Sequence, residues 1–294
     1  MTNPFDKLKG ILPPREIKVS KESPLERLIK LNRELEEEIT IPDGWYYKLP
    51  EFRPKLYDQI SKRAGNYDVQ DISNLTTALS FEESKNQRTR GAYIGGLLSL
   101  LTEKNHELNK TTSLEIDLQG RKFPYLFLAC KYVDTLKISN VKGDYVGSNI
   151  ARDNGNAEMI SFNNVRGERV GFGIAMDKGN AEMISFDNVE GDDIGSWIAN
   201  NGNAGVISFD KIEGDWVGCE IASYNGNVGI VSFDKIKGDR VGYGIAEYKG
   251  KCDILDFEGK YSSQVKQFIE EQRQKYQNRE QLNKDIQEFI RGLR

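Results

Sequence analysis

The stretch GNAEMISFNNVRGERVGFGIAMDKGNAEMISFDNVEGDDIG, residues Gly155 to Gly195, contains the string GNAEMISF twice, 24 residues apart. The surrounding sequence repeats with the same period, because one glycine recurs at steps of 24, 24, 23 and 24 residues. A fixed period of this size is typical of proteins built from stacked structural repeats. The recurring glycines are Gly143, Gly167, Gly191, Gly214 and Gly238.

Each repeat begins with an alternating run such as MISF, which is typical of a β-strand. A turn signal of glycine and an acidic residue follows, then a second strand-like run such as RVGFGIA, then a closing GN turn. The pattern predicts a mostly β fold, a single-stranded parallel β-solenoid of about six coils of 23–24 residues. We expect the coils to stack about 4.8 Å apart. We also expect them to wind in the right-handed sense that parallel crossovers favour.

Positions that change little from coil to coil are expected to face the core. They form ladders in which each buried Ile or Phe stabilises the fold by about 1.5–3 kcal/mol. An asparagine after the closing glycine recurs in four coils and predicts an amide ladder at one corner. The two main apolar ladders are Leu136, Ile160, Ile184, Ile207, Val231, Leu255 and Ile138, Phe162, Phe186, Phe209, Phe233, Phe257; the asparagines are Asn156, Asn180, Asn203 and Asn227.

A second apolar column directly precedes the first core ladder. Adjacent residues of a strand face opposite sides of the sheet, so this column is expected to face outward. An outward apolar stripe needs a cover, which is either another part of the chain or a partner. We favour the chain, because a C-terminal amphipathic helix of about 16 residues would match the height of five coils. The outward column consists of Met159, Met183, Val206, Ile230 and Ile254.

The sequence divides into three regions of different character. Residues 1–113 carry helical patterns and predict a mainly helical N-terminal domain. Residues 114–260 hold the repeats of the solenoid, and residues 261–294 predict C-terminal helices that cover or cap it. The N-terminal helices are expected near Ser23–Ile39, Glu51–Gly65 and Glu83–Asn105.

Composition favours a cytoplasmic protein. The 294 residues carry a net charge of −4, so the chain has no general attraction for nucleic acid. The first residues lack an apolar signal region, and the longest apolar run, Gly91–Thr102, is too short to cross a membrane. Cys130, Cys219 and Cys252 lack metal-binding spacing and are expected to be reduced thiols.

No motif in the sequence predicts a catalytic centre, a metal site or a cofactor. His106 is the only histidine, and it lies in TEKNHEL, where an exposed histidine at a helix end is the expected arrangement. GxG in GFGIA and GYGIA belongs to the repeat and predicts no dinucleotide site. We therefore expect a protein that is not an enzyme.

An acidic column after the recurring glycine is the one arrangement that could carry chemistry. Carboxylates on adjacent coils would lie about 5 Å apart, near the separation in retaining glycosidases. The chain resembles the parallel β-helix proteins in architecture, and that group includes polysaccharide lyases and hydrolases, although none of their catalytic motifs matches here. A simple glycine–acid turn explains the same residues. The column consists of Asp144, Glu168, Asp192, Asp215 and Asp239.

The sequence favours a non-enzymatic scaffold or protein-interaction module, with a protein partner or a second copy of the chain as its target. A carbohydrate-binding or carbohydrate-active β-helix that uses the acidic column is one alternative. A factor that acts on the ribosome or nucleic acid through its termini is another, since exposed aromatic residues could stack on bases. The candidates for stacking on bases are Trp45, Tyr46, Tyr47 and Trp216, and the carbohydrate alternative would use Trp197 or Trp216. The sequence does not identify the partner or the oligomeric state.

Overall fold

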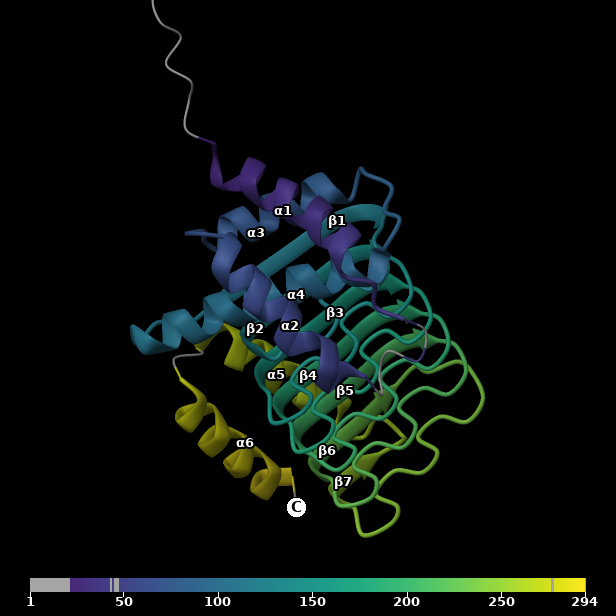
Figure 1. Ribbon diagram of the computed structural model, residues 1–294. Coiled ribbons are helices and arrows are strands. Elements are labelled where there is room, and N and C mark those ends of the chain that lie inside the picture. The colour runs from purple at the N-terminus through teal and green to yellow at the C-terminus, as the bar shows by residue number, and fades with distance from the viewer. Residues whose placement is uncertain (1–21, 43, 45–47, 276–277, 294) are drawn as a thin grey trace, which may run out of the picture.

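The computed structural model describes residues 22–42, 44, 48–275 and 278–293. These residues form six helices and one seven-stranded sheet in the order of Figure 1. The strands are β1 (Ser113–Lys122), β2 (Tyr132–Lys142), β3 (Asn156–Arg166), β4 (Asn180–Glu190), β5 (Asn203–Glu213), β6 (Asn227–Asp234) and β7 (Lys251–Asp256). All neighbouring strands pair in parallel and in chain order, which confirms a parallel β-solenoid of about six turns.

The register of the sheet follows the sequence repeat. Ile160 pairs with Ile184, and Phe162 pairs with Phe186, so identical side chains lie directly above one another. The phenylalanine rings stack along the core, with centroids 4.9 Å apart from Phe162 to Phe233 and 5.1 Å apart in the last step to Phe257. The ring spacing equals the spacing of hydrogen-bonded strands, so one geometry satisfies backbone and core together.

The expected asparagine ladder is confirmed at the corner where each strand begins. The Nδ2 atom of Asn180 donates to Oδ1 of Asn156 at 3.1 Å, and Asn203 donates to Asn180 at 2.9 Å. Asn227 continues the ladder to Asn203 at 3.1 Å. Asn180 and Asn203 therefore each donate to the coil before them and accept from the coil after them.

The second strand-like run of each coil is not a strand, so that sequence expectation is wrong. In RVGFGIA, positive φ alternates along the chain, with values of 56° at Arg169, 65° at Gly171 and 57° at Ala175. Backbone of this kind cannot join a β-ladder. The amide of Arg169 instead donates to Asp192 of the next coil, and that of Gly171 donates to Val146 of the previous coil. The run carries its large apolar residues at Val170, Phe172 and Ile174, the alternation that is typical of a strand, which explains the misassignment. No observation tests the handedness, which stays a prediction.

Four helices cover the first coil: α1 (Pro24–Glu38), α2 (Leu49–Arg63), α3 (Val69–Leu79) and α4 (Gln87–Glu107). Ser23 begins α1 with a capping box, in which its hydroxyl accepts from the Glu26 amide. Helix α3 packs on β1, and α4 packs on β2. The sequence analysis did not predict α3, although Asp68 caps it in the same way.

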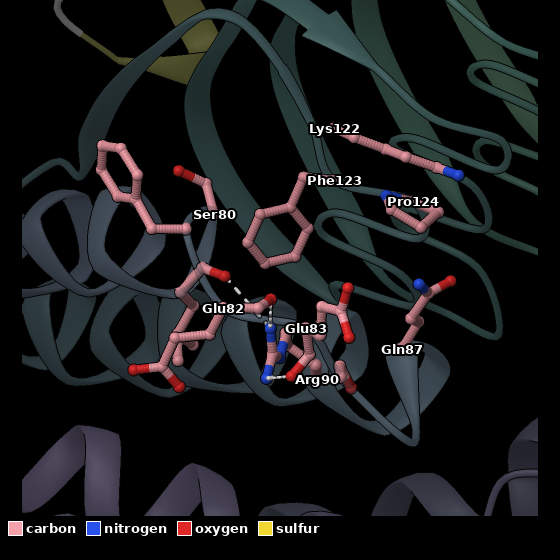
Figure 2. A pocket seen from close by; sticks show the side chains of 11 residues that line it. Ser80, Glu82, Glu83, Gln87, Arg90, Lys122, Phe123 and Pro124 are labelled. Atoms are coloured by element: carbon pink, nitrogen blue, oxygen red, sulfur yellow. Dashed lines mark hydrogen bonds between the residues drawn. The ribbon is translucent and has the colours of Figure 1, made fainter.

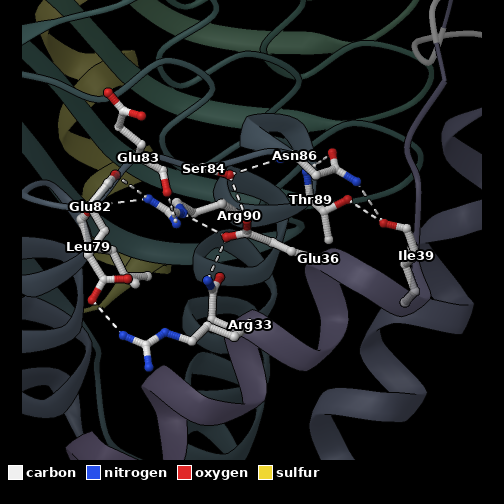
Figure 3. Close-up of polar contacts among 11 residues, drawn as sticks. Arg33, Glu36, Ile39, Leu79, Glu82, Glu83, Ser84, Asn86, Thr89 and Arg90 are labelled. Carbon is white, nitrogen blue, oxygen red and sulfur yellow. Dashed lines mark hydrogen bonds and ion pairs between the residues drawn. The ribbon is translucent and has the colours of Figure 1, made fainter.

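The buried guanidinium of Arg90 on α4 joins the N-terminal helices. Its Nε donates to Oε1 of Glu36 on α1 at 2.7 Å, and its other nitrogens donate to carbonyl oxygens of the loop between α3 and α4. Ser84 also donates to Glu36, as Figure 3 shows. One buried ion pair therefore fixes α1, α4 and the loop at the same time.

The C-terminal helices α5 (Ser262–Lys275) and α6 (Arg279–Leu293) lie along one side of the solenoid, coloured yellow in Figure 1. They bury the outward apolar column in a second core, separate from the solenoid interior. Helix α6 approaches closely because glycine replaces larger residues beneath it: a Cβ on Gly229 would lie 2.5 Å from Cδ1 of Ile290. The cover of the apolar stripe is thus the chain's own C-terminal segment.

Loss of the Arg90 side chain is expected to destabilise the N-terminal helices strongly. Arg90→Ala leaves the Glu36 carboxylate buried without its ion-pair partner, so the free energy of unfolding should fall by about 3–5 kcal/mol. Arg33→Ala is the matched control, because the Arg33–Glu82 pair is exposed and should contribute at most about 1 kcal/mol. Urea denaturation of both variants measures the difference, and equal losses would contradict a central role for Arg90.

The recurring glycine column should not tolerate a side chain. Gly191 has a φ of 140°, and an added Cβ would lie 2.1 Å from the carbonyl oxygen of Gly167. We expect Gly191→Ala to lower the free energy of unfolding by at least about 2 kcal/mol. Gly292→Ala, on α6 with nothing within 4 Å of the added atom, should instead be neutral or stabilise by up to about 1 kcal/mol. Thermal denaturation of the two variants compares them, and a tolerated Gly191→Ala would contradict the tight stacking of coils.

Candidate functional site

The acidic column lies on an exposed turn of the solenoid. Three of its five carboxylates accept a hydrogen bond from the backbone of the next coil: Asp144 accepts from the Glu168 amide at 3.0 Å, and Asp192 accepts from the Asp215 amide at 2.9 Å. Asp215 accepts from the Asp239 amide in the same way. This geometry supports a role in the turn, and no observation favours a glycan site along the column.

The outward apolar column is buried beneath α5 and α6, away from solvent. Met183, Val206 and Ile230 are almost fully enclosed by side chains such as Ile269 and Ile286. Ile254, at the end of the column, is only partly buried. The column therefore offers no free surface to a partner while the two helices remain in place.

The candidate aromatic residues are scattered. Trp45, Tyr46 and Tyr47 lie outside the described residues. Trp197 stacks on Phe172 with centroids 5.9 Å apart, whereas Trp216 lies near the last coil under the guanidinium of Arg240, 4.1 Å from the ring. They do not form a single platform for bases or sugars within the described part of the chain.

The two ends of the solenoid differ sharply in exposure. At the first coil, Leu114 and Ile116 of β1 are buried under the N-terminal helices. At the last coil, Leu255 is 42% exposed and Phe257 is 50% exposed, although Phe233 one coil earlier is only 2% exposed. In Figure 1, β7 forms the edge of the stack farthest from α1–α4. We call this surface the open end.

Further aromatic side chains surround the open end. Tyr224 and Tyr248 stack with centroids 5.1 Å apart, and Tyr243 packs edge-on against Trp216 at 6.2 Å. All four side chains are exposed. Among the described residues, they and the two exposed core residues account for six of the eight large apolar side chains that are exposed, which makes the open end the main apolar surface.

A pocket of about 420 Å³ lies between the loop after α3 and the first coil, and Figure 2 shows its lining. The lining contains the buried guanidinium of Arg90 together with Glu82, Lys122 and Phe123. The Arg90 guanidinium is already used by Glu36 and three carbonyl oxygens. This pocket is a hollow beside a structural ion pair, and none of its described lining residues has a buried side-chain polar atom without a hydrogen-bond partner.

A second, open pocket of about 720 Å³ lies between the end of α4, the starts of β2 and β3 and the start of α6. Three acidic residues on consecutive strands, Asp134, Glu158 and Glu182, form a buried column, and the first two of them line the pocket. Asp134 accepts from the Thr112 amide and lies 2.6 Å from Nε2 of His106, and Glu182 accepts from Nε of Arg279 at 2.9 Å. His106 is thus half exposed at a helix end, as expected, but its partner is a buried carboxylate.

Glu158, the middle acid, has no such partner. Its side chain is 6% exposed, and Oε2 receives no hydrogen bond from any described group. Burial raises the pKa of Glu158 to about 8; the neighbouring Asp134 and Glu182 add to the rise, and Arg279 opposes it. Glu158 is therefore a buried carboxyl that lines an open pocket and has one oxygen without a hydrogen-bond partner, which makes it a candidate functional group.

Other chemistry finds little support among the described residues. No group of three or more His, Cys, Asp or Glu side chains could hold a metal ion there. The three cysteines are unpaired, and burial raises the pKa of Cys130 to about 12, which disfavours a nucleophilic thiolate. No helix in the described part of the chain is long and apolar enough to cross a membrane.

Sequence analysis missed both the open end and the Glu158 pocket. The open end depends on where the last strand stops relative to α5, which the repeat pattern does not specify. The pocket had one signal: the position of Asp134, Glu158 and Glu182 becomes glycine at Gly205 and Gly229. The change from acid to glycine coincides with a change in the contacts of α6, which pairs Arg279 with Glu182 but packs Ile286 on Gly205 and Ile290 on Gly229.

Comparison of the chain with protein-family models, curated proteins and solved structures finds no match.

Titration of Glu158 should make stability fall as pH rises. The raised pKa means that the folded protein keeps a proton that the unfolded chain loses above its ordinary pKa of 4.5. The contribution of this group to the free energy of unfolding is therefore complete below pH 4.5 and is lost by about pH 8. Glu158→Gln keeps the neutral shape, so we expect it to match the wild type near pH 4.5 and to exceed it above pH 8.

Urea denaturation at pH values below and above this window measures the effect. Glu213→Gln, which removes an exposed acid elsewhere on the solenoid, serves as the control and should show no such trend. A stability difference between wild type and Glu158→Gln that stays constant across the window would contradict the titration of Glu158.

Proposed function

We propose that this protein is a non-enzymatic interaction module that binds a second copy of itself through the open end of its solenoid. The observation that carries the proposal is the exposure of Leu255 and Phe257, whose counterparts in earlier coils fill the core. An exposed core layer next to an unpaired strand edge is a surface that a protein normally covers. The acidic turns and the pockets support no reaction that would argue for an enzyme.

The two ends of the solenoid determine the kind of assembly. The N-terminal helices bury β1, so the open end of one copy cannot stack on the first coil of the next. The remaining contact joins two open ends, and this contact closes after two copies by twofold symmetry. The charges of Lys251 and Asp253 on β7 oppose indiscriminate edge pairing and favour one defined arrangement.

The aromatic residues around the open end supply contacts suited to such an interface. Tyr243 and Tyr248 are exposed, and aromatic side chains are enriched among residues that dominate binding energy. Arg240 stacks on Trp216 within the same surface. We propose that these residues form the rim of the dimer contact, with Phe257 and Leu255 at its centre.

Substitution of the central phenylalanine tests the dimer. We expect the wild type to sediment with twice the mass of the 33.4 kDa chain and Phe257→Lys to sediment as a monomer. The dissociation constant of the dimer should rise at least about thirtyfold in the variant. Analytical ultracentrifugation over a concentration series measures both. Phe81→Lys, which changes another exposed phenylalanine at the far end of the molecule, should leave the dimer intact. A wild-type chain that stays monomeric at high concentration would sink the proposal.

A further inference from the structure

We propose that the pocket between α4 and α6 binds a small organic cation, a guanidinium or primary ammonium compound, against the carboxylate of Glu158. The site is independent of the dimer contact proposed above. Its lining joins His106 and Glu103 of α4, Asp134 and Glu158 of the solenoid and Arg279 of α6.

The acidic column itself indicates what the ligand should be. Each end of the column is satisfied by a donor from a flanking helix: His106 of α4 lies against Asp134, and Arg279 of α6 donates to Glu182. Glu158 lies between them and lines the gap between the two helices. Its Oε2 is enclosed by protein and receives no hydrogen bond from a described residue, so the ligand would meet the carboxyl group from the pocket side. We place the ligand beside Glu158 in the same way that the Arg279 guanidinium lies beside Glu182 on the next coil.

The charge of the pocket favours a cation over an anion. Glu103, Glu107, Asp134 and Glu158 line it, and burial raises the pKa of Glu103 as well. Of the basic side chains in the lining, Arg279 is engaged by Glu182 and His106 by Asp134, while Lys110 lies at the exposed rim. A buried carboxylate gains most from a partner that is both charged and a hydrogen-bond donor.

Size and donor geometry separate an organic cation from a metal ion. The pocket volume of about 720 Å³ is in the range that holds small organic ligands. Within the described residues, the side chains do not form a group of ligands suited to a metal ion. A guanidinium presents several N–H donors in one plane and can reach Glu158 without a complete coordination shell.

Binding should release a proton. Burial together with Asp134 and Glu182 holds much of Glu158 protonated at neutral pH, while Arg279 opposes this. A bound cation favours the carboxylate, so the Glu158 proton leaves to the buffer as the ligand enters. Proton release that disappears in Glu158→Gln distinguishes a ligand that contacts Glu158 from one that attaches to the other acids of the pocket.

Calorimetric titration of the full chain with agmatine and with spermidine at pH 7 tests the site, with N-methylurea as an uncharged probe. Repetition in two buffers of different ionisation enthalpy gives the number of protons released. We expect one site for at least one of the cations, a proton released to the buffer on binding, and no heat with N-methylurea. Both probes carry a primary ammonium, so binding of agmatine alone would identify the guanidinium as the recognised group, and binding of both would identify the shared ammonium.

Two variants make the result specific. Glu158→Gln should fold as wild type and weaken binding at least about tenfold. Glu213→Gln should bind as wild type. Absence of binding by both cations, equal binding by Glu158→Gln, or binding without proton release would each overturn the proposal. Tighter binding of Mg²⁺ than of either organic cation at the same site would overturn it as well.

The Phe257→Lys variant, which is expected to lose the dimer, tests the cation site independently of the proposed function. The pocket lies at the second and third coils, so this variant should retain cation binding. Failure of cation binding with an intact dimer would count against the Glu158 site alone, and a wild-type chain that stays monomeric but binds the cation would count against the dimer alone.

Discussion

The stacking of each coil on an identical coil is the constraint on which the rest of the structure depends. Strands repeat at the spacing of backbone hydrogen bonds, and the phenylalanine rings stack 4.9 Å apart at the same spacing. Any side chain on one coil therefore meets its own counterpart above and below. Positions that tolerate this self-contact become ladders, and a position where the backbones approach most closely, such as Gly191, can hold only glycine.

The same constraint explains how much of the fold could be predicted. The contacts within the columns of Ile, Phe and Asn could be predicted from the repeat alone. The neighbour of Phe186, for example, is another phenylalanine at the same place in the repeat. The outward position of Met159 followed from the alternation of a strand, and the structure buries it beneath α5 and α6. The run after each strand was misassigned, because alternating left-handed turns produce the same apolar pattern as a strand.

The candidate sites lay beyond such reasoning because they arise where the repetition ends. Glu158 is unusual only in relation to His106 and Arg279, which come from helices 52 positions before it and 121 positions after it in the sequence. Nothing in the repeat predicts where those helices pass. Phe257 stacks on Phe233 as the phenylalanine ladder predicts. It is exposed because no further coil covers it among the described residues.

The C-terminal helices also limit how the solenoid can change in length. Helix α5 has 14 residues and spans about 21 Å, close to the roughly 19 Å between the first and last strands of the apolar stripe. A gene can lengthen a solenoid simply by duplicating one coil, yet here the extra methionine or isoleucine would extend past the helix that shelters it. The length of α5 therefore limits the number of coils, and a coil can be added only if the helix is lengthened to cover it.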